Sequence, residues 1–200
     1  MSYHRERIEQ FIAGEAKPVD KYGHQPRLYA LTRQVGAGLS YDDDIVHAAV
    51  WLHDLGVFFG HRPSGLAELE RWDSVRYAMT RAPALLKQFG FPVEKIDAVV
   101  DAIRTHQPSG QPVAIEGVIV RDADILEQLG AIAILRTVSK VGRDTRFPRF
   151  TEAVESLKKA MGTLPAMIRL ESTRTMAEPK IAALEAFLGA VAAEDQGALE

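Results

Sequence analysis

The sequence predicts an all-α protein that folds as a single domain, a bundle of helices. Apolar residues recur at spacings of three and four over most of the 200 residues, and no period-two alternation is long enough for a sheet. No Ser/Gly-rich linker or internal repeat divides the chain. We expect the domain to cover residues 1–194, with C-terminal helices over 150–194 and a frayed tail over 195–200.

Glycines separate three predicted helices in the first part of the chain. The first runs from about residue 3 to residue 12. The second carries apolar residues from Leu28 to Val35 and ends at the glycines that follow. Ser40-Tyr-Asp-Asp43 has the pattern of a capping box, so we expect it to open a third helix, which Gly56 ends.

Prolines, glycines and polar runs divide the remainder of the chain. Pro92 is well placed for the first turn of a helix that His106 ends. The other predicted elements are a loop over 58–65, helices over 66–79 and 83–89, a loop over 107–112, a helix over 115–134, a loop over 143–148, and a last helix with apolar positions from 181 to 191.

Composition excludes several classes of protein. A hydrophobic share of 46% and a charged share of 26% are ordinary for a soluble globular protein. A net charge of −3 gives no basic face for a nucleic-acid polymer. No stretch approaches the roughly 20 apolar residues of a membrane span, and the N-terminus has no signal-peptide pattern. We therefore expect a cytoplasmic protein with neither nucleic acid nor membrane as partner.

The residues His53 and Asp54 are the most informative feature of the chain. They lie at the end of an apolar run, His47-Ala-Ala-Val-Trp-Leu-His-Asp-Leu-Gly56, which is expected to be a buried helix. A buried imidazole beside a buried carboxylate needs a partner that satisfies both, and a divalent metal ion does so. Because the chain has no cysteine, any metal ligands are nitrogen and oxygen atoms.

Four side chains are candidate ligands for one divalent ion, each on or near a predicted helix: His24, His53, Asp54 and Asp124. Imidazole and carboxylate together suit Mn²⁺, Fe²⁺, Mg²⁺, Zn²⁺, Co²⁺ or Ni²⁺, and helical bundles commonly hold such sites between facing helices. Four ligands in an octahedral shell leave about two positions, one for water and one for a substrate phosphate oxygen. This arrangement supports metal-assisted hydrolysis.

These residues resemble the signature of the HD-domain superfamily of metal-dependent phosphohydrolases. The matching stretches are His24-Gln-Pro-Arg-Leu-Tyr29, Ala48-Ala-Val-Trp-Leu-His-Asp-Leu-Gly56 and Asp122-Ala-Asp-Ile-Leu-Glu127. The resemblance covers about residues 21–136, so it implies an HD-type bundle with its metal-site core there. The segment 116–136 is similar to a subgroup of small bacterial HD hydrolases, some of which hydrolyse nucleotides.

The chain departs from that subgroup in ways that bear on the metal. Ile125 and Glu127 stand where relatives have Arg and Asp. Relatives with two metals carry an additional His after the HD helix, whereas the nearest stretch here, Glu70-Arg-Trp-Asp-Ser74, has none. The resemblance therefore implies one divalent ion, not two.

Two ligand assignments have rivals. Asp122 and Asp124 stand about 200° apart on a helix, so both can hardly reach one ion. Asp122 shares an apolar face, which indicates burial, whereas the resemblance places the ligand at Asp124. Asp122 is then expected to orient a ligand histidine or an arginine. His47 is the rival of His24, but on its helix it points away from His53, and we expect it to pack elsewhere.

Further residues are candidates by their position around this site. Asp54 and His106 are the catalytic candidates; His106 ends a helix, where it can contact substrate or interact with the helix dipole. Arg27, one turn after His24, and Arg136 are candidates for binding a phosphate, and a surface salt bridge is the alternative for each.

The expected function is hydrolysis of a small phosphorylated substrate, a nucleotide or another phosphate ester, by a metal-activated water. An HD-type di-iron oxygenase and a non-catalytic module that binds a metal or a nucleotide are the alternatives. Apolar surface on the last helix and on the Phe58-Phe59 loop leaves a homodimer open.

Overall fold

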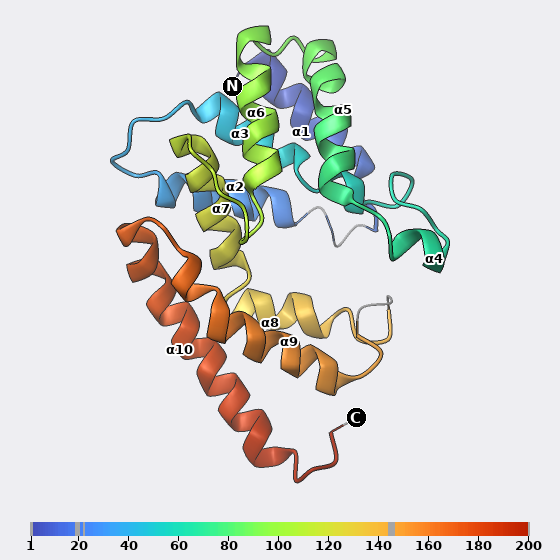
Figure 1. Ribbon diagram of the computed structural model, residues 1–200, viewed down its shortest axis with the longest axis vertical. Coiled ribbons are helices and arrows are strands. Elements are labelled where there is room, and N and C mark those ends of the chain that lie inside the picture. The colour runs from blue at the N-terminus through green and yellow to red at the C-terminus, as the bar shows by residue number, and fades with distance from the viewer. Residues whose placement is uncertain (1, 19–20, 22, 144–146, 200) are drawn as a thin grey trace. The chain divides into compact units, whose positions relative to one another are not determined.

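The computed structural model describes residues 2–18, 21, 23–143 and 147–199, and the regular structure in these residues is helical (Figure 1). They contain two isolated bridges, Phe59–Arg62 and Val141–Phe147, and no strand. The all-α prediction is confirmed. The elements in order are α1 (Tyr3–Glu15), α2 (His24–Val35), α3 (Asp43–Leu52), η2 (Leu55–Val57), α4 (Leu66–Leu69), α5 (Ser74–Gln88), η3 (Val93–Lys95), α6 (Ile96–Thr105), α7 (Ile115–Glu127), α8 (Gly130–Val138), α9 (Phe150–Thr163), η4 (Pro165–Met167) and α10 (Glu171–Glu194).

Helix α3 is the centre of the first of two compact units, Met1–Ala123 and Asp124–Glu200. Every residue of α3 from Ile45 to Leu52 is buried, as expected of a helix that is apolar on all sides. Helices α1, α2 and α6 pack against α3, and α5 packs against α6 and η2 (Figure 1). The expectation of a single domain over 1–194 stays a prediction.

The beginning of α3 differs from the predicted capping box. Asp42, not Ser40, is the N-cap, and its Oδ1 accepts a hydrogen bond from the Asp44 amide at 3.0 Å. A carboxylate caps a helix as well as a hydroxyl does, and two further acids in the first turn interact favourably with the helix dipole. The helix therefore begins two residues later than predicted, with Asp42 in place of Ser40 as the N-cap.

A charged network joins α1 and α2 to the start of α3. Arg5 Nη1 lies 2.8 Å from Asp43 Oδ2, Arg5 Nη2 lies 2.7 Å from Asp44 Oδ1, and the Tyr29 hydroxyl donates to Asp43 Oδ2 at 2.7 Å. Burial acts to raise the pKa of Asp44, but hydrogen bonds from Arg5 and His4 outweigh it and hold that pKa at about 2. Burial and the bond to Asp43 raise the pKa of Tyr29 to about 12. Asp44 therefore stays ionised at neutral pH.

Two helices are predicted over 66–79 and 83–89, but in the structure the break between the two helices of this region lies earlier, between Leu69 and Ser74. Asp73 accepts a hydrogen bond from the Arg76 amide at 2.8 Å and starts α5, which separates it from the short α4. Helix α5 then continues through Pro83, because its buried face runs from Ala78 to Leu86 across the proline. Packing of that face outweighs the backbone hydrogen bond that a proline removes.

The helix predicted over 115–134 is two helices. Helix α7 ends at Glu127, Leu129 is extended, and α8 begins at Gly130 with φ of 80°. Side chains disfavour this left-handed conformation, and a Cβ at Gly130 would lie 3.0 Å from the Cβ of Lys180 on α10. Glycine at this position therefore allows both the change of direction and the close approach of α10.

Helices α8, α9 and α10 pack on one another in the second unit (Figure 1). The last helix begins at Glu171, earlier than the apolar pattern predicts, and contains Pro179. Its buried residues, Thr173, Ala177, Leu184 and Leu188, continue one face across the proline. In the second unit, as in α5, a continuous buried face accounts for a proline inside a helix.

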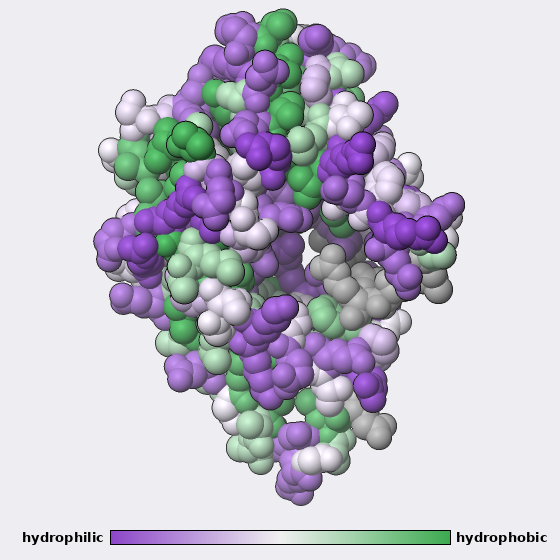
Figure 2. All heavy atoms as spheres, in the orientation of Figure 1, coloured by the Kyte–Doolittle hydropathy of each residue, from purple (hydrophilic) through white to green (hydrophobic). Residues whose placement is uncertain are grey.

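Polar side chains dominate the face of the molecule shown in Figure 2, with hydrophobic ones interspersed among them. In the described part of the chain, no helix combines the length and the apolarity that crossing a bilayer requires.

Candidate metal centre

Two histidines and one aspartate come together in the structure. His24, His53 and Asp124 each offer one ligand atom, and these atoms lie within 4.8 Å of one another. His24 Nε2 and His53 Nε2 are 3.3 Å apart, both rings are buried, and Asp124 is half-buried. This is the one such group among the described residues, and it unites three of the four predicted ligands.

Helix ends position the ligands. His24 is the first residue of α2, and His53 is the C-cap of α3. Asp124 lies on α7, one continuous helix (Ile115–Glu127). The division between the two units falls within this helix, just before Asp124. Segments far apart in the sequence thus contribute one side chain each, which is the usual construction of a site in a helical protein.

The chain turns sharply after His53. The α-helix ends at Leu52, before the predicted stop at Gly56, and η2 follows. A Cβ at Gly56 would lie 2.4 Å from the carbonyl oxygen of Ser74, so glycine allows η2 to contact the start of α5. Trp72 donates its indole N–H to the Gly56 carbonyl at 2.7 Å. These contacts fix the segment that carries Asp54.

A hydrogen bond identifies the ring nitrogen of His53 that donates. Its Nδ1 lies 2.8 Å from the carbonyl oxygen of Val50, which can only accept, so Nδ1 carries the proton. With Nδ1 as the donor, a ring that carries a single proton presents the lone pair of Nε2 near His24. His106 has the same arrangement, with Nδ1 2.6 Å from the carbonyl oxygen of Ile103. Each histidine caps a helix and satisfies a carbonyl of its last turn.

The two predicted catalytic residues lie beside the histidines. Asp54 Oδ1 is 3.6 Å from His53 Nε2, Asp54 Oδ2 is 3.7 Å from His24 Nε2, and the side chain is 26% exposed. The buried ring of His106 packs edge-to-face on that of His53, with centroids 4.8 Å apart. Asp54 is not a member of the three-residue group, and its role as a ligand stays a prediction.

The distance between the two imidazole nitrogens fits a shared ion. Ligand atoms about 2.1 Å from one ion are about 3.0 Å apart at a right angle and about 3.4 Å apart at a tetrahedral angle. The observed 3.3 Å separation lies in this interval. Two imidazole nitrogens and a carboxylate oxygen suit Mn²⁺, Fe²⁺, Zn²⁺ and similar ions, so the residues present fit the predicted divalent ion.

The two aspartates of α7 have different partners. Asp122 is fully buried, and Arg121 Nη1 lies 3.4 Å from its Oδ1. The same guanidinium donates to the carbonyl oxygen of Pro108, with Nη2 at 2.6 Å. Asp124 instead accepts a hydrogen bond from the side-chain amide of Gln128, with Nε2 3.0 Å from Oδ2. Asp124 belongs to the candidate metal-ligand group, and Asp122 is a partner of a buried arginine.

Sequence reasoning missed Gln128 and Arg121. The spacing of four residues from Asp124 to Gln128 is the signal that points to their contact, because such pairs are neighbours on a helix. The expectation that Asp122 orients an arginine did not name Arg121, whose second partner, the Pro108 carbonyl, belongs to a loop.

The two arginines predicted to bind phosphate have different surroundings. Arg27 is exposed on α2, and its guanidinium bends back toward the start of the helix: a Cβ at Gly23 would lie 2.9 Å from Arg27 Nη1. Arg136 Nη1 lies 2.9 Å from Oε2 of buried Glu127. Arg136 therefore forms an ion pair, but with a buried acid and not the surface salt bridge named as its alternative. Phosphate binding stays a prediction for both arginines.

The rival ligand His47 lies in another environment. Its Nε2 is 2.9 Å from Glu9 Oε1 on α1, and its ring packs on Tyr29 and Trp51. Burial lowers the pKa of His47, although the hydrogen bond to Glu9 acts in the opposite direction. His47 is outside the ligand group, in agreement with the expectation that it packs elsewhere.

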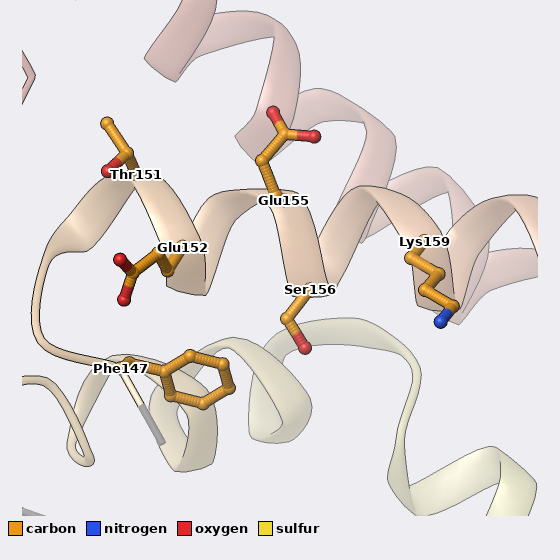
Figure 3. A pocket seen from close by; sticks show the side chains of 6 residues that line it. All are labelled: Phe147, Thr151, Glu152, Glu155, Ser156 and Lys159. Carbon is orange, nitrogen blue, oxygen red and sulfur yellow. The ribbon is translucent and has the colours of Figure 1, made fainter. Parts of the chain in front are cut away.

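A separate hollow of about 550 Å³ lies along α9 in the second unit (Figure 3). Its lining residues are Phe147, Thr151, Glu152, Glu155, Ser156 and Lys159. Both glutamates have basic partners one turn away, since Glu152 pairs with Arg149 and Glu155 with Lys158. None of the predicted site residues lines this hollow, and both of its glutamates form ion pairs with residues three positions away.

Comparison with known families and structures gives a consistent result. The HD domain family model matches residues 22–129, a segment that contains all the residues of the group described above. No curated protein matches the chain.

Solved structures of similar fold come from several bacteria. Bacillus subtilis YpgQ in complex with ADP is 21% identical, covers 97% of this chain and 96% of its own, and has a TM-score of 0.71. A predicted HD superfamily hydrolase from an uncultured Thermotogales bacterium is 23% identical, with coverages of 96% and 92% and a TM-score of 0.66. An HD-superfamily hydrolase from Bacillus thuringiensis is 20% identical, with 95% coverage of both chains and a TM-score of 0.67. These similarities establish the fold.

Proposed function

The chain belongs to the HD-domain family, and we propose that it is a metal-dependent phosphohydrolase acting on a nucleotide or another small phosphate ester. The observation that carries this proposal is the 3.3 Å separation of His24 Nε2 and His53 Nε2, in one group with Asp124. A pair of buried imidazoles with facing nitrogens, next to carboxylates, has the chemistry of a site for one divalent cation.

The ligand residues would hold the ion in a defined position. His24, His53 and Asp124 supply two neutral donors and one charged donor. Asp54, beside both histidines, supplies a second carboxylate as ligand or as base. When bound, a divalent ion lowers the pKa of a coordinated water and polarises a phosphoryl oxygen.

Asp54 and His106 carry the proton transfers of the proposed reaction. As water attacks phosphorus, an oxygen–phosphorus bond forms, and Asp54 accepts the proton that the water loses. The bond from phosphorus to the leaving oxygen breaks, and protonated His106 donates its Nε2 proton to that oxygen. The hydrogen bond from His106 Nδ1 to Ile103 keeps Nε2 as the nitrogen that exchanges the proton.

The nucleotide part of the proposal rests on two observations. Arg27 is exposed three residues after His24, where a guanidinium can contact a phosphate. The YpgQ structure, of the same fold, is a complex with ADP. A nucleoside diphosphate or triphosphate is therefore the first substrate class to test.

The test is a substrate panel with metal-free protein. The chain is stripped with a chelator and supplied with Mn²⁺, Mg²⁺, Fe²⁺, Co²⁺, Zn²⁺ or Ni²⁺, and release of phosphate and pyrophosphate is measured from nucleotides and simple phosphate esters. Activity should require an ion and be lost in His53→Ala but not in the control His4→Asn. If no ion supports turnover of any substrate in the panel, the proposal fails.

The di-iron oxygenase alternative makes a different prediction for the same preparation. It requires two irons per chain, and hence ligands beyond the His24, His53 and Asp124 group. Elemental analysis near two irons per chain, with oxygen consumption and no phosphate release, would favour it over hydrolysis.

A further inference from the structure

The side chain of Gln128 contacts the carboxylate of Asp124 directly. Gln128 Nε2 donates to Asp124 Oδ2 at 3.0 Å and approaches the Asp124 carbonyl oxygen at 3.2 Å. The two residues are four positions apart, at the point where α7 ends. One amide therefore links the main chain and the side chain of the only acidic member of the ligand group.

The main chain around Gln128 is fixed on both sides. Its amide N–H donates to the Ile125 carbonyl at 3.0 Å. The preceding residue, Glu127, is buried and paired with Arg136 at 2.9 Å, and the following residue, Leu129, is fully buried. The Gln128 amide is therefore held at a defined place relative to Asp124.

A neutral donor suits a residue that orients a metal ligand. An amide hydrogen bond fixes the rotation of a carboxylate about its Cβ–Cγ bond and leaves the negative charge in place. Each carboxylate oxygen has two lone-pair directions, so acceptance of one hydrogen bond still allows coordination. Asp122, by contrast, lies beside the cationic Arg121, which offsets its charge.

We propose that Gln128 is a positioning residue for the metal site: it holds the Asp124 carboxylate in the orientation that binds the cation. This inference rests on the metal site of the proposed function but not on the identity of the substrate. Groups that hydrogen-bond to ligands typically change metal affinity 10- to 100-fold when removed.

The experiment compares Mn²⁺ binding by the metal-free 200-residue chain and its variants, measured by isothermal titration calorimetry. Gln128→Met keeps the length of the side chain and removes the donor. The expected result is a Kd for Mn²⁺ about 10- to 100-fold higher than that of wild type. The melting temperature of the metal-free protein should stay within a few degrees of wild type. Gln34→Met, at an exposed position of α2, is the matched control and should bind Mn²⁺ as wild type does.

Gln128→Leu repeats the test with a side chain of different shape. Both Gln128 variants should weaken binding; a Kd within two-fold of wild type in both, or an equal loss in Gln34→Met, overturns the inference. If the wild-type chain binds Mn²⁺ but hydrolyses no substrate, the proposed function is contradicted. The comparison of Mn²⁺ affinities still tests the role of Gln128 in that case. A wild-type chain that binds no Mn²⁺ overturns both.

Discussion

His53 and Val50 are joined by a hydrogen bond of 2.8 Å between the imidazole Nδ1 and the carbonyl oxygen one turn earlier. The bond places the proton on Nδ1 and leaves Nε2 as the donor atom for a cation, 3.3 Å from His24 Nε2. The end of helix α3 thus supplies both the candidate ligand His53 and the carbonyl that orients it. A carbonyl in the last turn of a helix is suited to this role because it has no helical partner.

Replacing His53 tests this arrangement. In His53→Ala we expect loss of stoichiometric ion binding, because one of the two facing nitrogens is gone. The variant also leaves the Val50 carbonyl without its partner, at a cost of about 1–3 kcal/mol. Elemental analysis and circular dichroism melting measure the two effects separately. Wild-type ion affinity in a folded His53→Ala would contradict the assignment.

The two aspartates of α7 should respond differently to neutral substitution. Asp124→Asn is expected to weaken ion binding with a small effect on the metal-free protein, because Asp124 is half-buried and belongs to the ligand group. Asp122→Asn should destabilise the metal-free protein by about 3–5 kcal/mol, since it removes a charge beside buried Arg121.

Urea unfolding of the metal-free variants, together with Mn²⁺ titration, distinguishes the two aspartates. The opposite pattern, with Asp122→Asn stable but unable to bind the ion, would show that Asp122 is the ligand and Asp124 is not.

Most of the fold could be predicted from the sequence, because helix positions follow the spacing of apolar residues. The buried run that ends at His53 identified the central helix α3. The predictions were wrong where local signals were equivalent, as at Ser40 and Asp42, or where tertiary packing outweighed them, as at Pro83. The break at Gly130 depends on the approach of Lys180, which is 50 positions away in the sequence.

Three of the four predicted ligand candidates lie together in the structure. Residue type and family resemblance point to His24, His53 and Asp124, because few side chains bind metal ions. The groups that orient them are less visible. The carbonyl of Val50 has no side-chain signature, and the role of Gln128 depends on the exact end of α7, which sequence patterns place only within a few residues.

Acid should weaken the fold through Asp44. Its pKa is about 2 in the folded protein, below the ordinary 3.8, owing chiefly to hydrogen bonds from Arg5 and His4 that overcome burial. A lowered acid pKa contributes stability that is complete above about pH 4 and is lost as pH falls toward 2. The contribution is at most about 2 kcal/mol, because the side chain is 26% exposed and solvent screens it.

The variant Asp44→Asn isolates this effect. It should be less stable than wild type in urea at pH 6, and the difference should shrink as pH falls from 4 to 2. A constant difference over that interval would show that the Asp44 charge is not the cause.

His47 should add a second pH dependence at higher pH. Burial lowers its pKa below 6.5 in the folded protein, although the hydrogen bond to Glu9 opposes the shift. The unfolded chain therefore binds a proton first as pH falls below about 6.5, and stability decreases, by at most about 1.4 kcal/mol per pH unit. Urea midpoints at pH 7.5 and 5.5 should differ more in wild type than in His47→Phe; equal differences would contradict this origin.

Arg27 and Arg136 should separate substrate binding from stability. Arg27 is exposed near His24, so Arg27→Ala should weaken the binding of ADP in the presence of Mn²⁺ about tenfold or more, through loss of a charged hydrogen bond, and leave the melting temperature unchanged. Arg136→Ala removes the partner of buried Glu127, so it should cost about 1–3 kcal/mol of stability with a smaller effect on ADP. Calorimetric titration and thermal melting of both variants give the comparison. A loss of ADP affinity in Arg136→Ala alone would show that Arg136 on α8, and not Arg27 on α2, contacts the phosphate.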